Sequence, residues 1–278
     1  MGPSRAELTQ GVEGEDPTGG VSLRRLPSFS LWIDEQPRPG WANMSIDLSL
    51  LDSAELEGKA WLRLYQWDPH CLSFGRHEPA LRTYDVNRIR TMGLDTVRRP
   101  TGGRAVWHAR ELTYAVAAPS HVFGSPRRAY LEIHHLLGAA LKAIGVETSL
   151  APRGRSAPLD GGACFSQPAG GEVLVQGRKV IGSAQLRRGT ALLQHGSILL
   201  NDDQRVVAGL MRGSPQPEPP ELELSLGKPA SAVAEQIAGA ARLRWNGRWE
   251  RVRDPEPIVR AASLHFPQFR SSTWTWAR

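Results

Sequence analysis

Two hydrophobic periodicities divide the chain into predicted strands and helices. Residues 61–67, WLRLYQW, alternate with the period of two that is typical of a strand, although neither face is cleanly apolar. Residues 172–175 and 178–181 predict a hairpin around the two-residue turn Gln176-Gly177. Further short apolar runs predict strands at residues 71–75, 95–99, 105–108, 112–117 and 198–200. Together these segments predict a mixed or antiparallel sheet.

Segments with a helical repeat alternate with these strands. The clearest follows Ser125-Pro126, because serine is a good N-cap, proline suits the first helical position and Gly145 ends the pattern. Three more helices are predicted at residues 43–56, 84–92 and 231–241, with Gly93 as the C-cap of the second. Residues 245–249, WNGRW, fit either a two-residue hairpin turn or a helix exit.

The two ends of the chain differ from its middle. Residues 1–27 are rich in Gly, Pro, Glu and Ser with few apolar anchors, so we expect a disordered leader. Residues 28–278 are expected to form one domain, since a hydrophobic content of 40% is enough to bury a core. Its C-terminal part is expected to be irregular, with the aromatic residues of 266–276 docked on the domain surface.

Charge and cysteine content narrow the functional classes. The chain carries 34 Lys+Arg against 28 Asp+Glu, a net charge of +6 that favours acidic partners such as carrier proteins or nucleic acid. No apolar run has the length of a membrane span, and the N-terminus lacks the order of a secretory signal. We therefore expect a cytoplasmic protein. Cys71 and Cys164 are too few for a disulfide framework and are expected to be free thiols.

Cys164 lies in a glycine-rich stretch, and Lys179 follows fifteen residues later on the second arm of the predicted hairpin. A thiol with a pKa of about 8.5 is mostly protonated at neutral pH, and a neighbouring ammonium stabilises the nucleophilic thiolate. If the fold brings the two residues together, they can attack and polarise a bound acyl group. The alternative is that Cys164 is a small buried filler and Lys179 a solvated turn residue.

Four longer motifs resemble a known superfamily. They are RRPTGGRAVWH from residue 98, ELTYAV from residue 111, GRKVIGSAQ from residue 177 and LQHGSILL from residue 193. The set resembles the lipoate/biotin protein ligase and octanoyltransferase superfamily, and the preceding CF pair resembles its cysteine-dependent octanoyltransferase branch. The resemblance covers roughly residue 41 to the C-terminus. It implies an α+β catalytic domain of the class II aminoacyl-tRNA/biotin synthetase-like type, with a mixed, mostly antiparallel sheet flanked by helices.

The resemblance also implies a reaction and its site. Cys164 would take an octanoyl group from octanoyl-acyl carrier protein, and a lysine of a lipoyl-domain protein such as the glycine cleavage H protein would receive it. Lys179 would be the superfamily's active-site lysine and support both steps. No cofactor or metal is implied. The residues expected to bind substrate are Arg99, Gly102, Gly103, His108, Gly182, Ser183 and His195.

Departures from related branches refine this expectation. Adenylating lipoate ligases resemble this chain less, because they carry a third glycine where it has Arg104 and an Asp-x-Gly-Asn run where it has residues 109–112. Ala109 also departs from the aspartate usual in the octanoyltransferase branch. An ATP-dependent lipoate ligase and an amidotransferase between lipoyl domains stay open as alternatives. A non-catalytic nucleic-acid-binding protein is a third, although no recognition-helix motif supports it.

Two further residue types carry weaker signals. His134 and His135 could suggest a metal site, but adjacent side chains diverge on a helix and no third ligand is spaced for them, so we expect no zinc. Cys71 lies in an apolar strand and is expected to be a core residue. His195 precedes the strand predicted at residues 198–200, where it either holds the carbonyl of the acyl group or simply ends the strand, and we favour a structural role beside the pocket.

Overall fold

The computed structural model describes residues 26–152, 165, 170–201, 203–215 and 224–277. The leader expected at residues 1–27 lies almost entirely outside this set, and so does Cys164. Both expectations therefore stay predictions.

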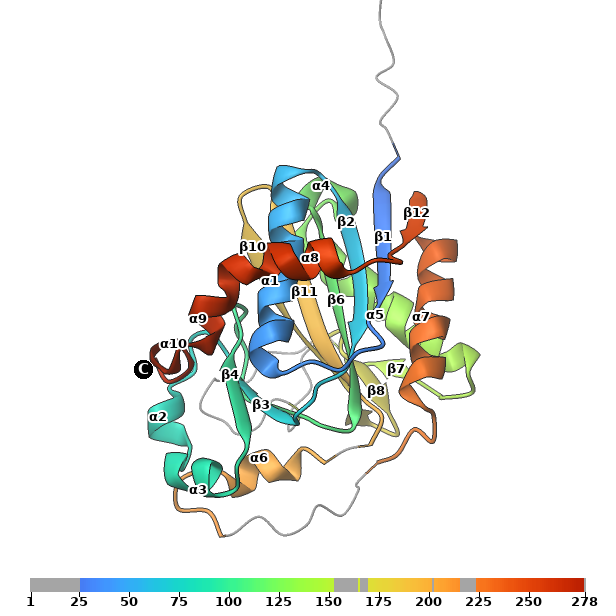
Figure 1. Ribbon diagram of the computed structural model, residues 1–278. Coiled ribbons are helices and arrows are strands. Elements are labelled where there is room, and N and C mark those ends of the chain that lie inside the picture. The colour runs from blue at the N-terminus through green and yellow to red at the C-terminus, as the bar shows by residue number, and fades with distance from the viewer. Residues whose placement is uncertain (1–25, 153–164, 166–169, 202, 216–223, 278) are drawn as a thin grey trace, which may run out of the picture.

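A six-stranded mixed sheet forms the centre of the fold (Figure 1). Its strand order is β10-β11-β6-β2-β1-β12. The pairs from β10 to β2 are antiparallel, whereas β2, β1 and β12 run parallel. The strands are β1 (Ser28–Ile33), β2 (Ala60–Tyr65), β6 (Glu111–Pro119), β10 (Ile181–Arg188), β11 (Ala191–Leu199) and β12 (Arg248–Arg251).

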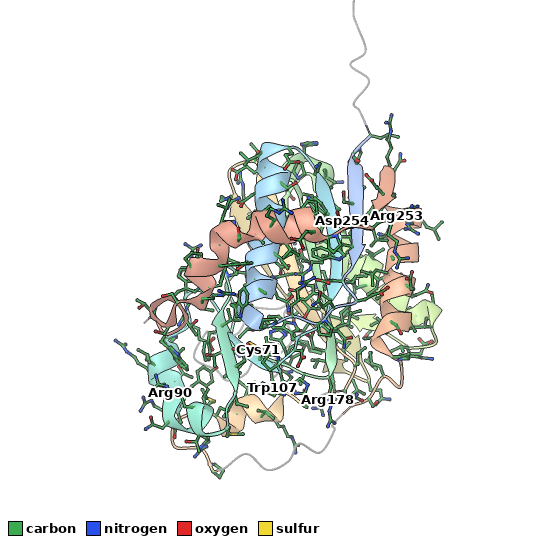
Figure 2. The ribbon with its side chains drawn as sticks, viewed as in Figure 1. Cys71, Arg90, Trp107, Arg178, Arg253 and Asp254 are labelled. Carbon is green, nitrogen blue, oxygen red and sulfur yellow. The ribbon has the colours of Figure 1, made fainter. Side chains whose placement is uncertain are left out.

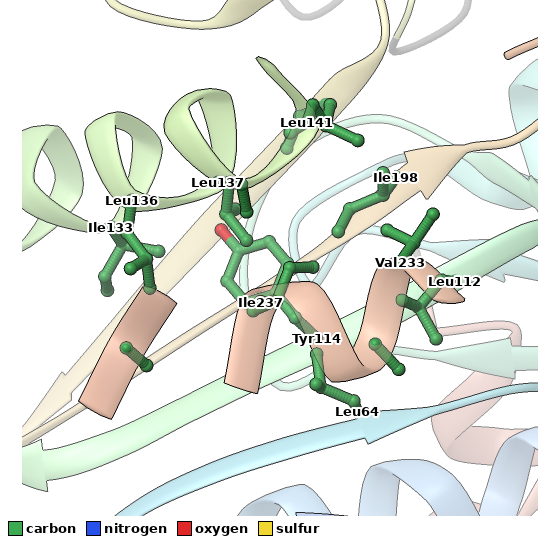
Figure 3. Close-up of a cluster of buried hydrophobic side chains, with 14 of the residues drawn as sticks. Leu64, Leu112, Tyr114, Ile133, Leu136, Leu137, Leu141, Ile198, Val233 and Ile237 are labelled. Carbon is green, nitrogen blue, oxygen red and sulfur yellow. The ribbon is translucent and has the colours of Figure 1, made fainter. Parts of the chain in front are cut away.

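Helices cover both faces of this sheet. On one face lies α1 (Gly40–Leu56), over which α8 (Glu256–Ala262), the short 3₁₀ helix η1 (Ser263–His265) and α9 (Phe266–Arg270) pack. On the other face lie α5 (Pro126–Ala143) and α7 (Ala230–Arg244). Figure 3 shows this second interface, where leucines and isoleucines of α5 and α7 meet Leu64, Leu112 and Ile198 of the sheet. Two apolar cores therefore sandwich the strands.

Two three-stranded sheets extend the central one. The first has the order β4 (Asp95–Arg98), β3 (Cys71–Phe74), β5 (Val106–His108), and the second has the order β7 (Ser149–Leu150), β8 (Val173–Val175), β9 (Arg178–Lys179). The remaining helices are short: α2 (Ala80–Thr83), α3 (Val86–Thr91), α4 (Ser120–Phe123), α6 (Arg205–Gly209) and α10 (Ser272–Thr275). Among the described residues, no helix combines the length and apolar character needed to cross a membrane.

Elements were predicted correctly where the deciding contacts are between residues close together in the sequence. Ser125 caps α5 by accepting a hydrogen bond from the backbone of Arg128, and Gly145 follows the helix with a φ of 81°. The predicted hairpin forms β8 and β9, and Gln176 and Gly177 adopt φ values of 50° and 78° in its turn. These left-handed values are those of a type I′ turn.

Several boundaries were predicted wrongly. The helix expected from residue 43 begins at Gly40, directly after Pro39. The helix expected at residues 84–92 is the shorter α3, which begins at Val86 because Tyr84 is extended and Asp85 caps α3 through Arg88; the separate helix α2 precedes it. Residues 245–249 form a helix exit, and β12 then pairs in parallel with β1 and makes no hairpin. The strand β1 itself was not predicted.

The largest error concerns the hairpin of β10 and β11. The sequence predicted a strand only at residues 198–200, whereas β11 begins at Ala191 and pairs along its length with β10 around Gly189. Its central residues include Gln194 and His195, whose polarity concealed the strand. Likewise, the strand predicted at residues 61–67 is β2, which ends at Tyr65, and it shows no polar face because helices cover both sides.

Gly75→Ala should destabilise the protein by about 1–3 kcal/mol, the usual cost of overpacking a tight contact. A Cβ at this position would lie 1.8 Å from the Gly103 carbonyl oxygen. The matched control is Gly239→Ala in α7, where a Cβ would meet nothing within 4 Å. That change should stabilise the helix by up to about 1 kcal/mol. Urea unfolding of both variants measures the two effects, and equal stabilities would contradict the close approach of the two loops.

Candidate active site

A pocket opens where α1, the sheet and the loop after β4 meet. Apolar and aromatic side chains supply part of its wall, and the β10–β11 hairpin supplies another part. The lining residues are Met44, Tyr65, Trp67, Arg99, Gly103, Val106, His108, Thr113, Gly182, Ser183, Ala184, His195, Gly196 and Ser197. Six of the seven residues expected to bind substrate therefore border one space, and the seventh, Gly102, lies in the loop beside it.

Arg99 holds the glycine loop in place from beneath. Its Nη1 donates to the Ser73 carbonyl at 2.9 Å and to the Ser73 hydroxyl at 2.6 Å. Its Nη2 donates to the carbonyls of Arg104 at 2.8 Å and Gly102 at 3.2 Å. Gly103 has a φ of 94°, a left-handed value that favours glycine, and a close approach to Gly75. The predicted substrate loop is thus a rigid turn around a buried guanidinium.

His195 connects the loop to a buried carboxylate. Its Nδ1 lies 2.8 Å from Asp47 Oδ2, and its Nε2 lies 2.7 Å from the Thr101 hydroxyl. The carboxylate accepts from Nδ1, so Nε2 is left to accept from Thr101 when the ring is neutral. His195 lies in the middle of β11, so it does not end a strand. It both lines the pocket and fixes the glycine loop.

Asp47 in turn belongs to a buried ionic network. Its Oδ1 lies 3.1 Å from Arg63 Nη1, and the Tyr65 hydroxyl donates to its Oδ2 at 2.7 Å. Arg63 is fully buried and also bonds Asp34 Oδ2 at 2.7 Å and Asn43 Oδ1 at 2.8 Å. Burial, followed by the negative charge of Asp47, raises the pKa of Tyr65 well above its usual value. Tyr65 is therefore a neutral donor at the pocket wall.

His108 is a second fixed group that lines the pocket. Its ring stacks on Trp67 with the centroids 3.9 Å apart, and its Nε2 lies 2.6 Å from the Ser73 hydroxyl. Its Nδ1 lies 3.2 Å from Glu111 Oε1 and 3.2 Å from Ser197 Oγ. Burial lowers the pKa of His108 below its usual value. A neutral imidazole at this position orients the pocket wall without adding charge.

Ser183 lies between two polar residues from different helices and strands. The Tyr114 hydroxyl is 2.6 Å from Ser183 Oγ, and His134 Nε2 is 2.7 Å from the same oxygen. Gln194 donates to the Tyr114 oxygen at 2.8 Å, so the Tyr114 proton is directed to Ser183. Burial, followed by the positive charge of Lys179, lowers the pKa of His134 to about 4. The Ser183 hydroxyl is therefore positioned by neutral groups.

Lys179 is a buried ammonium next to this cluster. It is 6% exposed, and its Nζ lies 2.8 Å from Glu172 Oε1. The same ammonium lies 5.1 Å from the ring centroid of Phe165, a cation–π distance. A Cβ added at Gly182 would meet the Phe165 ring at 2.9 Å and Lys179 Cε at 3.2 Å. Glycine at position 182 thus allows the lysine stem and the aromatic ring to meet at the pocket wall.

Cys71 is the one cysteine among the residues that the structure describes. Cys71 is fully buried and free, as predicted for a core residue. Figure 2 labels it at the lower end of α1. Burial, followed by the negative charge of Asp95, raises the pKa of the Cys71 thiol well above its usual value. Cys71 is therefore an unreactive thiol.

Sequence reasoning missed several members of this site. His134 was considered only as a metal ligand, but it is buried against Ser183 while its neighbour His135 is exposed. Within the described residues, no group of three His, Cys, Asp or Glu side chains could hold a metal. Asp47, Tyr114, Glu172 and Thr101 had no assigned role. A buried polar residue in an otherwise apolar element was the only signal available for Asp47 and Tyr114.

The lining of the pocket suits an uncharged acyl group better than a charged ligand. Neutral hydroxyl, imidazole and backbone groups project into a space bordered by Met44, Val106 and Trp67. The buried ammonium of Lys179 lies next to Gly182, one of the lining residues, and it can stabilise negative charge on a thiolate or a carbonyl oxygen. The apolar border of the pocket suits an alkyl chain, and the lysine suits the carbonyl at the end of that chain.

Comparison with known proteins gives a consistent result. The family model of the lipoyl protein ligase A/B catalytic domain matches residues 39–229. The chain is 40% identical to octanoyltransferase LipM of Carboxydothermus hydrogenoformans over 62% of this chain and 65% of that one, just under two thirds of the relative's length. It is 37% identical to octanoyltransferase LipM of Symbiobacterium thermophilum over 75% of this chain and 83% of that one.

Solved structures agree on the fold. A bipartite lipoate protein ligase of Thermoplasma acidophilum superposes with a TM-score of 0.65 at 18% identity, covering 91% of this chain and 98% of that one. At this identity the likeness concerns the fold. It confirms the predicted α+β fold of the class II synthetase-like type.

The stability of the protein should fall as the pH drops from about 6.5 to about 4, partly through His134. The unfolded histidine has a pKa of about 6.5 and binds its proton first, whereas the folded one has a pKa of about 4. The contribution of neutral His134 to the free energy of unfolding is therefore complete above pH 6.5 and is lost as the pH falls toward 4. Over this range the free energy of unfolding of the His134→Gln variant should fall less than that of the wild type, by on the order of 3 kcal/mol. Urea unfolding at several pH values tests this, and exposed His135→Gln should behave as wild type.

Proposed function

Because the chain belongs to the lipoyl protein ligase A/B catalytic-domain family, we propose that it is an octanoyltransferase of lipoate assembly. It takes an octanoyl group from octanoyl-acyl carrier protein onto Cys164 as a thioester. It then delivers the group to a lysine of a lipoyl-domain protein, for which the glycine cleavage H protein is the expected acceptor. Cytoplasm is the expected compartment, where a free thiol such as Cys71 stays reduced.

The observation that carries this proposal is the position of Lys179. Its ammonium is buried next to Gly182, which lines the pocket, and approaches the ring of Phe165. Phe165 directly follows Cys164 in the sequence. The contact between Lys179 and the residue that follows Cys164 supports our proposal of a cysteine–lysine pair.

The first step forms the acyl-enzyme. The Cys164 thiolate attacks the carbonyl carbon of the donor thioester, and negative charge develops on the carbonyl oxygen. The ammonium of Lys179 stabilises that charge, while the carboxylate of Glu172 compensates the buried cation in the resting state. The carbon–sulfur bond to the carrier then breaks, and the carrier thiol leaves with a proton.

The second step transfers the acyl group to nitrogen. The neutral amine of the acceptor lysine attacks the Cys164 thioester, an amide bond forms and the Cys164 thiolate leaves. The amine loses one proton, which the thiolate or a pocket base accepts. Lys179 again stabilises the charge on the carbonyl oxygen. No ATP is consumed, since the thioester is already activated.

The remaining predicted site residues have binding roles in this proposal. Ser183 and the backbone around Gly182 flank the carbonyl, and His195 and Arg99 keep Gly102 and Gly103 in the shape that closes the pocket. His108 supports the far wall. Arg104 replaces a glycine typical of adenylating ligases and is 7% exposed, so a long side chain occupies this part of the loop. This supports thioester chemistry over an ATP-dependent ligase.

Mixing the protein with octanoyl-acyl carrier protein without ATP should add the mass of one octanoyl group. Hydroxylamine should remove the adduct, and Cys164→Ala should not form it. Cys71→Ala is the matched control and should still be acylated, because Cys71 is a buried thiol of raised pKa. Intact-protein mass spectrometry provides the measurement. ATP-dependent acylation of the acceptor that survives Cys164→Ala would instead make the protein a ligase.

Lys179→Met should slow acylation of Cys164 by about a hundredfold or more, the usual effect of removing a group that stabilises charge in the transition state. The exposed neighbour Arg178→Met is the control and should react at nearly the wild-type rate. A double variant with Glu172→Gln avoids an uncompensated buried carboxylate. Single-turnover acylation measures the rates, and a wild-type rate in both lysine variants would exclude the proposed role.

A further inference from the structure

Arginines cluster on the small helices beside the pocket. They are Arg76, Arg82, Arg88, Arg90 and Arg212, which we call the arginine face. They lie on α2, α3 and the adjoining loops, at the lower left of Figure 1. Figure 2 labels Arg90 on α3, where it extends outward from the molecule. All except the half-buried Arg88 are exposed.

Within the described residues, acidic side chains do not balance this charge. Residues 76–93 and 203–215 contain these five arginines, Arg205 and three acidic residues. Glu78 and Asp203 are buried, and Asp85 caps α3. In the described part of these two segments, no exposed acidic side chain therefore accompanies the arginine face.

Several of the arginines are held in place without being neutralised. Arg88 donates to the carbonyls of Gly209, Ser214 and Pro215. Arg212 donates to the carbonyl of Leu81 at 3.0 Å. Considering only residues that the structure describes, no ion pair involves Arg76, Arg82, Arg88, Arg90 or Arg212.

Three arginines elsewhere are neutralised within the protein. Arg188 pairs with Asp52 and with Glu55, and Arg244 pairs with Glu132. Arg251 pairs with Glu235 at 3.0 Å. Their own protein therefore satisfies these charges, whereas the arginine face is left for an external anion.

The face begins at the pocket itself. The backbone N–H of Arg76 donates to the Thr101 carbonyl at 2.8 Å, and the Thr101 hydroxyl lies 2.7 Å from His195. The neighbouring Gly75 packs directly against Gly103, which lines the pocket. From this loop the arginines continue outward over α2 and α3. A partner bound here is next to the pocket without covering it.

We propose that the arginine face docks the acidic surface of the acyl-carrier donor, an inference that rests on the proposed function. A carrier protein presents its thioester on a long phosphopantetheine arm, so it can bind beside the pocket and reach into it. An acceptor, in contrast, has no such arm and must bring one of its own lysine side chains close to the thioester. Guanidinium groups suit carboxylates and the phosphate of the arm. Nucleic acid is disfavoured, because α2, α3 and α6 are four, six and five residues long, too short for a recognition helix.

The test is the double variant Arg82→Glu/Arg90→Glu, which reverses two exposed charges without breaking a described ion pair. The matched control is Arg242→Glu/Arg253→Glu, the same charge change at exposed sites distant from Arg90, as the labels of Figure 2 show for Arg253. KM for octanoyl-acyl carrier protein should rise about tenfold or more in the first variant and little in the control. The rate with the small thioester octanoyl-N-acetylcysteamine should match wild type in both.

Other results would overturn the docking proposal. These are an unchanged KM for the carrier in the face variant, an equal rise in the control, or a rise in KM for the acceptor lipoyl domain instead. Loss of DNA retention on filters with an unchanged carrier KM would assign the face to nucleic acid. Binding of acyl carrier protein measured by fluorescence anisotropy needs no turnover. It therefore reports on docking even if wild type fails to transfer octanoate and the proposed function is wrong.

Discussion

The buried ion pair of Arg63 with Asp47 is the constraint on which the rest of the structure depends. Both side chains are fully buried, where desolvation costs several kcal/mol per ion, and removing one partner of such a pair costs about 3–5 kcal/mol. The pair connects β2 to α1. Asp47 extends it through His195 to Thr101 in the glycine loop, so the pocket keeps its shape only while the charges in the core are satisfied.

The sequence predicted structure best where a residue acts on its immediate neighbours. The cap at Ser125 and the turn at Gln176-Gly177 follow from backbone geometry, and both are present. It failed where partners distant in sequence decide the outcome. β11 was mostly missed because Gln194 and His195 interrupt its apolar pattern, yet both are buried because Tyr114 and Asp47 bond them. No local rule reveals such partners.

The candidate site shows the same division. Family resemblance identified six of the residues that border the pocket, because their motifs are contiguous. It could not identify His134, which reaches Ser183 from α5 across 49 positions, or Glu172 as the partner of Lys179. These contacts depend on how a helix packs against the sheet. The available signal was the position of His134 in the pattern of an amphipathic helix, but the sequence analysis considered His134 and His135 only as metal ligands and rejected that role.

Charge is divided between the pocket and the surface in a way that fits one chemistry. Inside, burial keeps Tyr114 and the two histidines His108 and His134 neutral, so in the proposed reaction the ammonium of Lys179 acts on the carbonyl in a setting with little screening. Outside, the arginine face has no such compensation and is screened by salt. In the proposed function, the arginine face attracts the acidic carrier, and the pocket accommodates the uncharged alkyl chain that the carrier brings. Long-range attraction and local catalysis can therefore vary independently in this fold, since different side chains provide them.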